Sequence, residues 1–163
     1  RRVTRGKSMI NIKARQLITQ GEGFRALPYR CPEGALTIGY GYNLDANPLR
    51  LTKADIDRFK SRGITKAEAL ALLTQLIEAL ELALNQQLPW WASLNQDRQA
   101  VLIDMAYNLG LAGLLRFTNT LRLLSLGEFA EAAQAMLSSR WAQQVKYRAY
   151  RNANIIKTGK FRV

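Results

Sequence analysis

The sequence predicts an α+β fold that is mainly α, built as a single domain with a small N-terminal lobe and a larger helical C-terminal lobe. Three observations predict it. The alternating run ALTIGYGYNL follows the turn sequence CPEG and indicates a β-hairpin. A capping box at Thr65 opens a long run of leucines at helical spacing. The second half of the chain then keeps helical spacing between glycine stops.

The N-terminal lobe is predicted over residues 10–64, after a basic extension or linker at residues 1–9. Apolar residues fall on one face of a helix from Ile10 to Gln20, and Gly21 offers a natural stop. CPEG, with Pro at its second position and Gly at its fourth, fits a type I turn. The strands around this turn form the hairpin, which a third strand can extend. A short helix is expected near Ala54–Lys60.

A long connecting helix is predicted over residues 65–86. The Thr65 hydroxyl can accept the Glu68 backbone N–H while the Glu68 side chain reaches back to Thr65, which is the reciprocal pattern of a capping box. A helix of about 20 residues is about 30 Å long, the diameter of a small domain. Such a helix can join two lobes.

The C-terminal lobe is predicted over residues 87–163 and is all helical. Gly110 and Gly127 are the glycine stops between its helices. The predicted helices are Asp97–Leu109, Phe117–Leu126, Glu128–Trp141 and Lys146–Lys157.

Composition restricts the chemistry that the protein can use. Of its 163 residues one is cysteine, Cys31, and none is histidine. This excludes an internal disulfide and Ser-His-Asp or Cys-His machinery, and it disfavours a zinc site. We therefore expect no metal and no cofactor, and any catalysis must use carboxylates, hydroxyls, the thiol or basic groups. The single cysteine suits a protein made in a reducing cytoplasm. No apolar run is long enough to span a bilayer, and no export signal is visible.

The net charge of +12 predicts attraction to polyanions. Nucleic acid, anionic lipid and a bacterial envelope all qualify, and a solvated basic surface without a partner is an equal alternative. The basic residues are scattered and no base-reading motif is present, which places nucleic acid last.

Glu22 stands between two glycines, just beyond the predicted end of the first helix. The partial negative charge of a helix C-terminus disfavours a second negative charge and tends to keep a carboxyl protonated. A general acid needs this property. Taken alone, the feature is more often an ordinary surface residue in a helix-end turn.

The residues downstream of Glu22 change that balance. In GEGFR the Glu is followed nine positions later by Cys31 and, six further on, by Thr37 inside LTIGYGY. The segments AYNLGLAGLLRFTNTLRLL and SSRWAQQVKYRA continue the pattern in the second half. With these motifs the chain resembles the phage lysozyme family, glycoside hydrolase family 24, from about Ile12 to Lys160.

The resemblance implies a lysozyme-like fold and hydrolysis of the β-1,4 bond between N-acetylmuramic acid and N-acetylglucosamine in peptidoglycan, with inversion. It implies that Glu22 is the general acid, that Thr37 holds the attacking water, and that Cys31 completes the catalytic set. Cys31 departs from the Asp-bearing pattern. As a thiolate it could replace the carboxylate, as a direct nucleophile it is improbable, and as a small half-buried residue it would have no chemical role.

The resemblance also implies substrate-binding positions at Asn108, Thr118, Asn119 and Arg148, the last matching the family arginine that pairs with the catalytic Glu. The predicted partners are peptidoglycan glycan strands and the anionic bacterial envelope. The protein is expected to act as a monomer on the cell wall after release from the host cytoplasm. The resemblance implies a holin for this release, without direct contact between the two proteins.

Two alternatives to this endolysin-type muramidase stay open from the sequence. A lytic transglycosylase needs one acid/base carboxyl and would keep Glu22. A cationic protein that binds the wall or membrane would need no chemistry at all.

Overall fold

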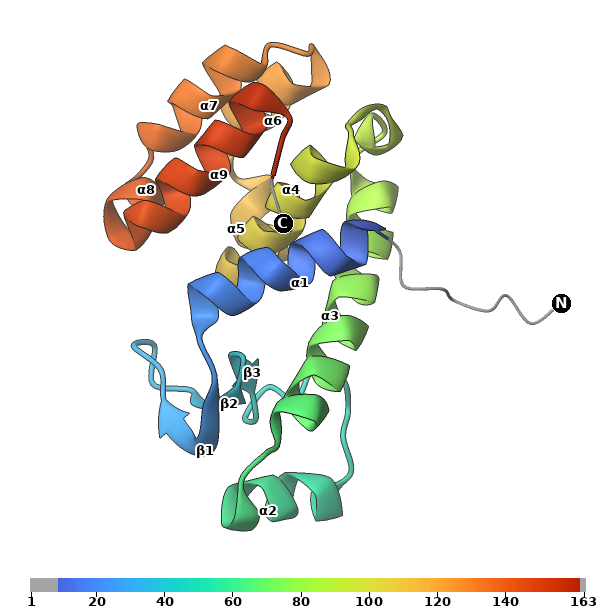
Figure 1. Cartoon of the computed structure of the whole chain (residues 1–163), viewed down its shortest axis with the longest axis vertical. Coiled ribbons are helices and arrows are strands. Elements are labelled where there is room, and N and C mark those ends of the chain that lie inside the picture. The colour runs from blue at the N-terminus through green and yellow to red at the C-terminus, as the bar shows by residue number, and fades with distance from the viewer. Residues whose placement is uncertain (1–8, 162–163) are drawn as a thin grey trace, which may run out of the picture.

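The computed structural model describes residues 9–161 of the chain. Figure 1 shows short strands at one end, helices gathered at the other, and α3 running between them. Helices dominate, and the strands form a three-stranded sheet, so the predicted α+β class is confirmed. The predicted extension at residues 1–9 lies outside the described residues except for Met9, which begins the first helix.

Helix α1 (Met9–Glu22) runs further than the sequence predicts. Gly21 does not end it, because Glu22 is its last residue. The glycine that ends it is Gly23, which has a φ of 69° and donates its N–H to the Thr19 carbonyl at 3.1 Å. Gly21 has a different role: a Cβ there would lie 2.6 Å from the guanidinium of Arg148.

The small sheet confirms the predicted hairpin and its third strand. Strands β1 (Arg25–Arg30), β2 (Leu36–Gly39) and β3 (Tyr42–Asn43) are antiparallel in that order. The turn between the first two closes with a hydrogen bond of 2.8 Å from the Gly34 N–H to the Cys31 carbonyl. Ile38 and Tyr42 are buried and belong to the smaller of two hydrophobic clusters.

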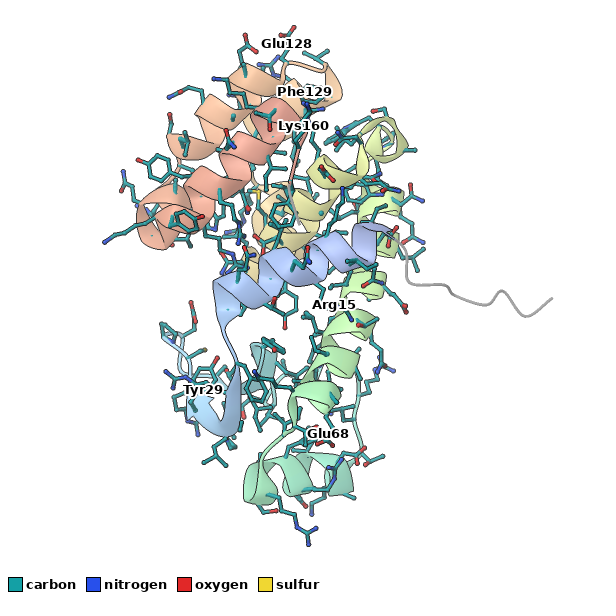
Figure 2. All side chains as sticks on the ribbon, in the orientation of Figure 1. Arg15, Tyr29, Glu68, Glu128, Phe129 and Lys160 are labelled. Atoms are coloured by element: carbon teal, nitrogen blue, oxygen red, sulfur yellow. The ribbon has the colours of Figure 1, made fainter. Side chains whose placement is uncertain are left out.

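The short helix α2 (Lys53–Arg62) and the long helix α3 (Lys66–Gln87) follow, both as predicted. Both hydrogen bonds of the predicted capping box between Thr65 and Glu68 are present, and Figure 2 shows Glu68 near the start of α3. The first turns of α3 pack into the smaller cluster through Ala69 and Leu72, and later residues enter the larger cluster. One helix thus joins two cores, while the domain bounds themselves stay a prediction.

The second half of the described chain is helical. Its elements are η1 (Trp91–Ser93), α4 (Gln96–Leu109), α5 (Leu111–Leu115), α6 (Thr118–Ser125), α7 (Phe129–Leu137), α8 (Arg140–Val145) and α9 (Tyr147–Thr158). The single helix predicted over Glu128–Trp141 is wrong, because α7 ends before Ser138 and the Ser139 hydroxyl caps α8 by accepting the Ala142 N–H. Serine side chains compete with helix continuation in this way. The short helix α5 was not predicted.

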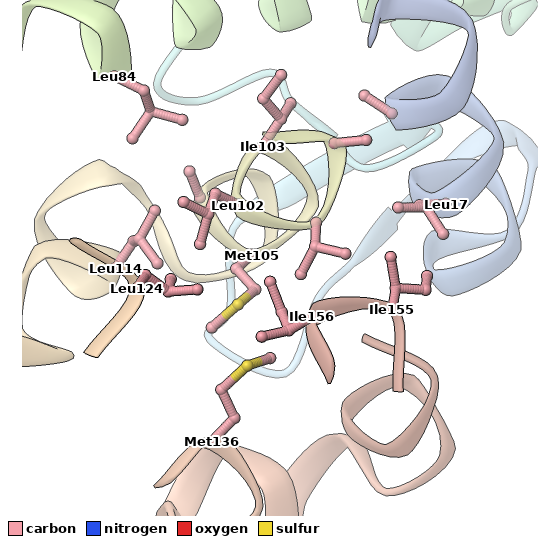
Figure 3. Packing of buried hydrophobic residues seen from close by; sticks show 14 of the residues in the cluster. Leu17, Leu84, Leu102, Ile103, Met105, Leu114, Leu124, Met136, Ile155 and Ile156 are labelled. Atoms are coloured by element: carbon pink, nitrogen blue, oxygen red, sulfur yellow. The ribbon is translucent and has the colours of Figure 1, made fainter. Parts of the chain in front are cut away.

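Helix α4 lies at the centre of the larger cluster. Leu102, Ile103 and Met105 have no exposed surface, and Figure 3 shows them among side chains from α1, α3, α5, α6, α7 and α9. A helix buried on nearly every side carries few polar residues. A charged residue in its middle therefore needs dedicated partners. No helix within residues 9–161 is both long and apolar enough to cross a membrane.

Candidate active site

Glu22 lies where the end of α1 meets the β2–β3 turn. Its side chain is 21% exposed, and its Oε1 atom accepts a hydrogen bond of 3.0 Å from Arg148 Nη1. The other oxygen, Oε2, faces the turn: a Cβ at Gly41 would lie 3.2 Å from it. Gly41 has a φ of 85°, so a side chain there would be strained as well as crowded. One carboxylate oxygen thus pairs with a cation, and the other lies against the backbone at Gly41, which carries no side chain.

Arg148 on α9 bridges two carboxylates. It donates to Glu22 through one nitrogen and to Asp104 of α4 through two, Nε at 3.2 Å and Nη2 at 2.7 Å. Burial opposes the charge of Arg148, but hydrogen bonds and charge from Asp104, and then from Glu22, outweigh it and raise the pKa of Arg148 above its ordinary value. The guanidinium is therefore a permanent cation fixed mainly by Asp104.

Asp104 has a fully buried side chain with several partners. Besides Arg148 it accepts from Arg151 Nη2 at 3.2 Å and from Asn152 Nδ2 at 2.7 Å. Sequence reasoning missed Asp104. The available signal was an acid inside the apolar run VLIDM, which a buried helix tolerates only when the acid is paired.

Two tyrosines that sequence reasoning also missed stand near Glu22. Burial and the Glu22 carboxylate raise the pKa of Tyr29 on β1, which Figure 2 labels, and they raise that of Tyr107 on α4 well above its ordinary range. The Tyr107 hydroxyl donates to the Tyr40 carbonyl at 2.6 Å. This bond ties α4 to the backbone that adjoins the β2–β3 turn.

The sheet brings Thr37 to the same side as Tyr29. The two residues are register partners on β2 and β1, and partners across a sheet share one face. Tyr29 lies within electrostatic reach of Glu22, and Thr37 is its cross-strand neighbour. Thr37 is buried, and its hydroxyl donates to the Ala35 carbonyl at 3.0 Å. Cys31 is half-buried at the start of the adjoining turn.

The other predicted site residues are spread more widely. Asn108 accepts a hydrogen bond of 2.7 Å from Trp141 Nε1, while Thr118 and Asn119 are exposed in an open groove of about 660 Å³ between α6 and α7. Asn108 does not line that groove. A larger groove of about 1380 Å³, between α1, α3 and α4, contains none of the predicted site residues.

A helical half packed around α4, with a small antiparallel sheet beside the carboxylate that ends the first helix, places the protein in the lysozyme-like α+β class. Comparison with known sequences agrees with this class. The family model described as phage lysozyme matches residues 19–152, a range that includes Glu22, Asp104 and Arg148. The chain belongs to the phage lysozyme family.

Individual relatives differ in how much of their length is matched. The pre-baseplate central spike protein Gp5 of Enterobacteria phage T4 is 29% identical over 91% of this chain, but the match covers 28% of that protein. The probable T4-type lysozyme 1 of Dictyostelium discoideum is 26% identical over 89% of this chain and 94% of its own. An endolysin of Acyrthosiphon pisum secondary endosymbiont phage 1 is 26% identical over 82% of this chain and 80% of its own.

Proposed function

We propose that the protein is a muramidase that hydrolyses the β-1,4 bond between N-acetylmuramic acid and N-acetylglucosamine in bacterial peptidoglycan. The observation that carries the proposal is the contact between Glu22 and Arg148 in a chain of the phage lysozyme family. The names of two relatives, a T4-type lysozyme and an endolysin, support the same class of activity.

Glu22 acts as the general acid in this proposal. It must hold a proton that it can pass to the glycosidic oxygen as the sugar ring gains oxocarbenium character. Oε1 already accepts from Arg148, so the proton belongs on Oε2, which lies against Gly41. Arg148 contacts two carboxylates, so we assign it to positioning Glu22 and not to binding sugar.

Thr37 holds the attacking water. Its hydroxyl hydrogen is already donated to the Ala35 carbonyl, so its remaining lone pairs can only accept. A water that donates to this oxygen turns a lone pair of its own toward the anomeric carbon. Attack by water from the face opposite the leaving group inverts the anomeric centre.

Cys31 and the more distant polar residues support this chemistry. As a thiolate, Cys31 would balance the charge that develops on the sugar ring, which is the part that a carboxylate would otherwise take. Thr118 offers a hydroxyl and Asn119 an amide to the substrate from the groove beside α6. We assign Asn108 an indirect part in substrate binding, through the hydrogen bond that it accepts from the Trp141 indole.

The remaining partners and the location follow from the same proposal. The net charge of +12 draws the protein to the anionic envelope, and the glycan strand is its substrate. It acts as a monomer without metal, cofactor or nucleic acid. It is made in the host cytoplasm and reaches the wall through a lesion of the holin type.

The test compares the parent with Glu22→Gln on purified peptidoglycan. The variant keeps the shape of the side chain but has no carboxyl proton, so release of new reducing ends is expected to fall on the order of 10²-fold or more. Circular dichroism and Tm should remain close to the parent. Undiminished release by the variant would refute the enzymatic proposal and favour a non-enzymatic cationic protein.

Product analysis of the parent separates the two enzymatic alternatives. Hydrolysis leaves reducing N-acetylmuramic acid, whereas transglycosylation leaves 1,6-anhydro ends that are lighter by one water in mass spectra. NMR of the first product gives the anomer, and inversion of a β bond releases the α form.

A further inference from the structure

Four charged side chains form one connected group beneath the candidate active site. Glu22 contacts Arg148, Arg148 contacts Asp104, and Asp104 contacts Arg151. With all four ionised the group is neutral. When Glu22 carries the proton that a general acid needs, the group bears one net positive charge.

Asp104 accepts hydrogen bonds from two nitrogens of Arg148, and Glu22 accepts one from the third. The two N–H groups that Arg148 donates to Asp104 form a bidentate pair, the strongest and most directional contact that a guanidinium makes. This pair fixes the guanidinium plane and leaves a single nitrogen, Nη1, for Glu22. Without this bidentate pair, Arg148 could rotate and donate two hydrogen bonds to Glu22. That arrangement favours the ionised carboxylate.

The surroundings show that this arrangement is specifically accommodated. Asn152 and Arg151 hold Asp104 from α9. Arg151 also donates to the Leu17 carbonyl and to Gln20, which ties the same network to α1. Gly21 leaves room for the guanidinium of Arg148 against α1.

We propose that Asp104 is a positioning residue for the general acid: it holds Arg148 in a one-nitrogen contact with Glu22 and shares the guanidinium charge, and so limits how strongly Arg148 favours the ionised carboxylate. The inference rests on the proposed function of Glu22. The other titratable groups that face Glu22 are Tyr29 from β1 and Tyr107 from α4, and those that face Asp104 are Arg148 and Arg151.

The main experiment is the pH profile of peptidoglycan hydrolysis by Asp104→Asn in the full chain. Asparagine keeps the size of the side chain but removes the charge, so Arg148 is released toward Glu22. The alkaline limb of the kcat profile should move to lower pH by about one unit or more. At neutral pH, kcat should fall about tenfold with KM nearly unchanged, and it should recover as the pH is lowered.

Asp97→Asn is the matched control. Asp97 is another buried acid of α4 with a basic partner, Lys13, and it makes no contact with the Glu22 network. This variant should lose stability and keep the parent pH profile. If the alkaline limb of Asp104→Asn stays at the parent pH, or if it moves equally in both variants, the inference is wrong.

Arg151→Gln tests the opposite sign and serves if Asp104→Asn does not fold. It removes a cation that shares the Asp104 charge, while Asn152 still holds the carboxylate, so more of that charge offsets Arg148 and the alkaline limb should move to higher pH. A limb that stays in place or moves to lower pH would overturn the proposal.

A ¹³C NMR titration of Glu22 separates this inference from the proposed function. It reports protonation of Glu22 in the folded protein without any turnover, so it is informative even if Glu22→Gln proves fully active. A Glu22 transition at lower pH in Asp104→Asn than in Asp97→Asn supports the inference, and coincident transitions contradict it.

Discussion

Two buried acids of α4, Asp97 and Asp104, show how one helix serves both stability and chemistry. Asp97 lies in the first turn, where the helix dipole already favours a negative charge, and it holds Lys13 of α1 and the Phe161 N–H. Asp104 lies further along, where the dipole offers little, and it is held by Arg148, Arg151 and Asn152. Asp97 fastens chain segments together, whereas Asp104 connects to Glu22 through Arg148.

The difference shows that burial does not by itself identify a functional acid. Both acids are buried and both pair with bases on neighbouring helices. What distinguishes Asp104 is that its partner, Arg148, has a second carboxylate as neighbour, and that this carboxylate is partly open to solvent. Substitutions on each side of the comparison should therefore affect different measurements.

Among the substitutions that test this comparison, the largest effect is expected from Gly21→Ala, which disturbs the contacts of Arg148 with Asp104 and Glu22 without removing a charge. The added Cβ would lie 2.6 Å from Arg148, so the guanidinium must move away from α1 and from its contact with Glu22. Activity on peptidoglycan should fall on the order of 100-fold, since small misplacements of catalytic groups have effects of that size.

Gly113→Ala is the control for that substitution. Gly113 also lies in a helix, α5, and its added Cβ meets only the Leu109 side chain. Its activity should stay within about twofold of the parent. If both alanine variants lost activity alike, the position of Arg148 would not explain the effect.

A smaller effect, on stability alone, is expected from Asp97→Asn. The amide can still accept from the Phe161 N–H but no longer neutralises Lys13, which is left partly buried. The free energy of unfolding should fall by about 2 kcal/mol in urea titrations. At temperatures where the variant is folded, its kcat should equal that of the parent, and a lower kcat would remove the contrast with Asp104.

Much of the fold could be predicted because its signals are local. The Thr65 capping box, the CPEG turn and the stop at Gly110 each depend on residues within a few positions of one another. Two of the errors arise where a local pattern indicates one structure and a distant or competing contact determines another. Gly21 looks like a helix stop but continues the helix and makes room for Arg148, while Ser138 and Ser139 interrupt a run with helical spacing.

The candidate site was less accessible to sequence reasoning for a physical reason. The contact between Glu22 and Arg148 joins residues 126 positions apart, and that between Asp104 and Arg148 joins residues 44 apart. No periodicity reports contacts at such separations. Glu22 and Arg148 were found through family resemblance, and Asp104 was missed because no pattern in its own helix says which partner neutralises it.

The smallest effect is expected at Glu68, a half-buried counterpart to the buried acids. Hydrogen bonds from Arg58 and the Thr65 N–H hold the pKa of Glu68 below its ordinary value. A pKa lowered by folding adds stability above the unfolded value, near pH 4, and this stability is lost as the pH falls through the folded value. Glu68→Gln keeps the capping box and removes the charge, so its Tm at pH 7 should fall by on the order of 2 °C.

The pH dependence of that difference is the sharper measurement. Once the pH falls below the lowered pKa of Glu68, the parent carries a neutral side chain there, so the Tm values of parent and Glu68→Gln should converge. Glu68→Ala removes the capping box as well and should remain less stable than both at every pH. If the difference in Tm between parent and Glu68→Gln persists at low pH, the stability depends on the shape of the side chain and not on its charge. Glu68 would then differ in kind from Asp97 and Asp104, whose contributions depend on charge.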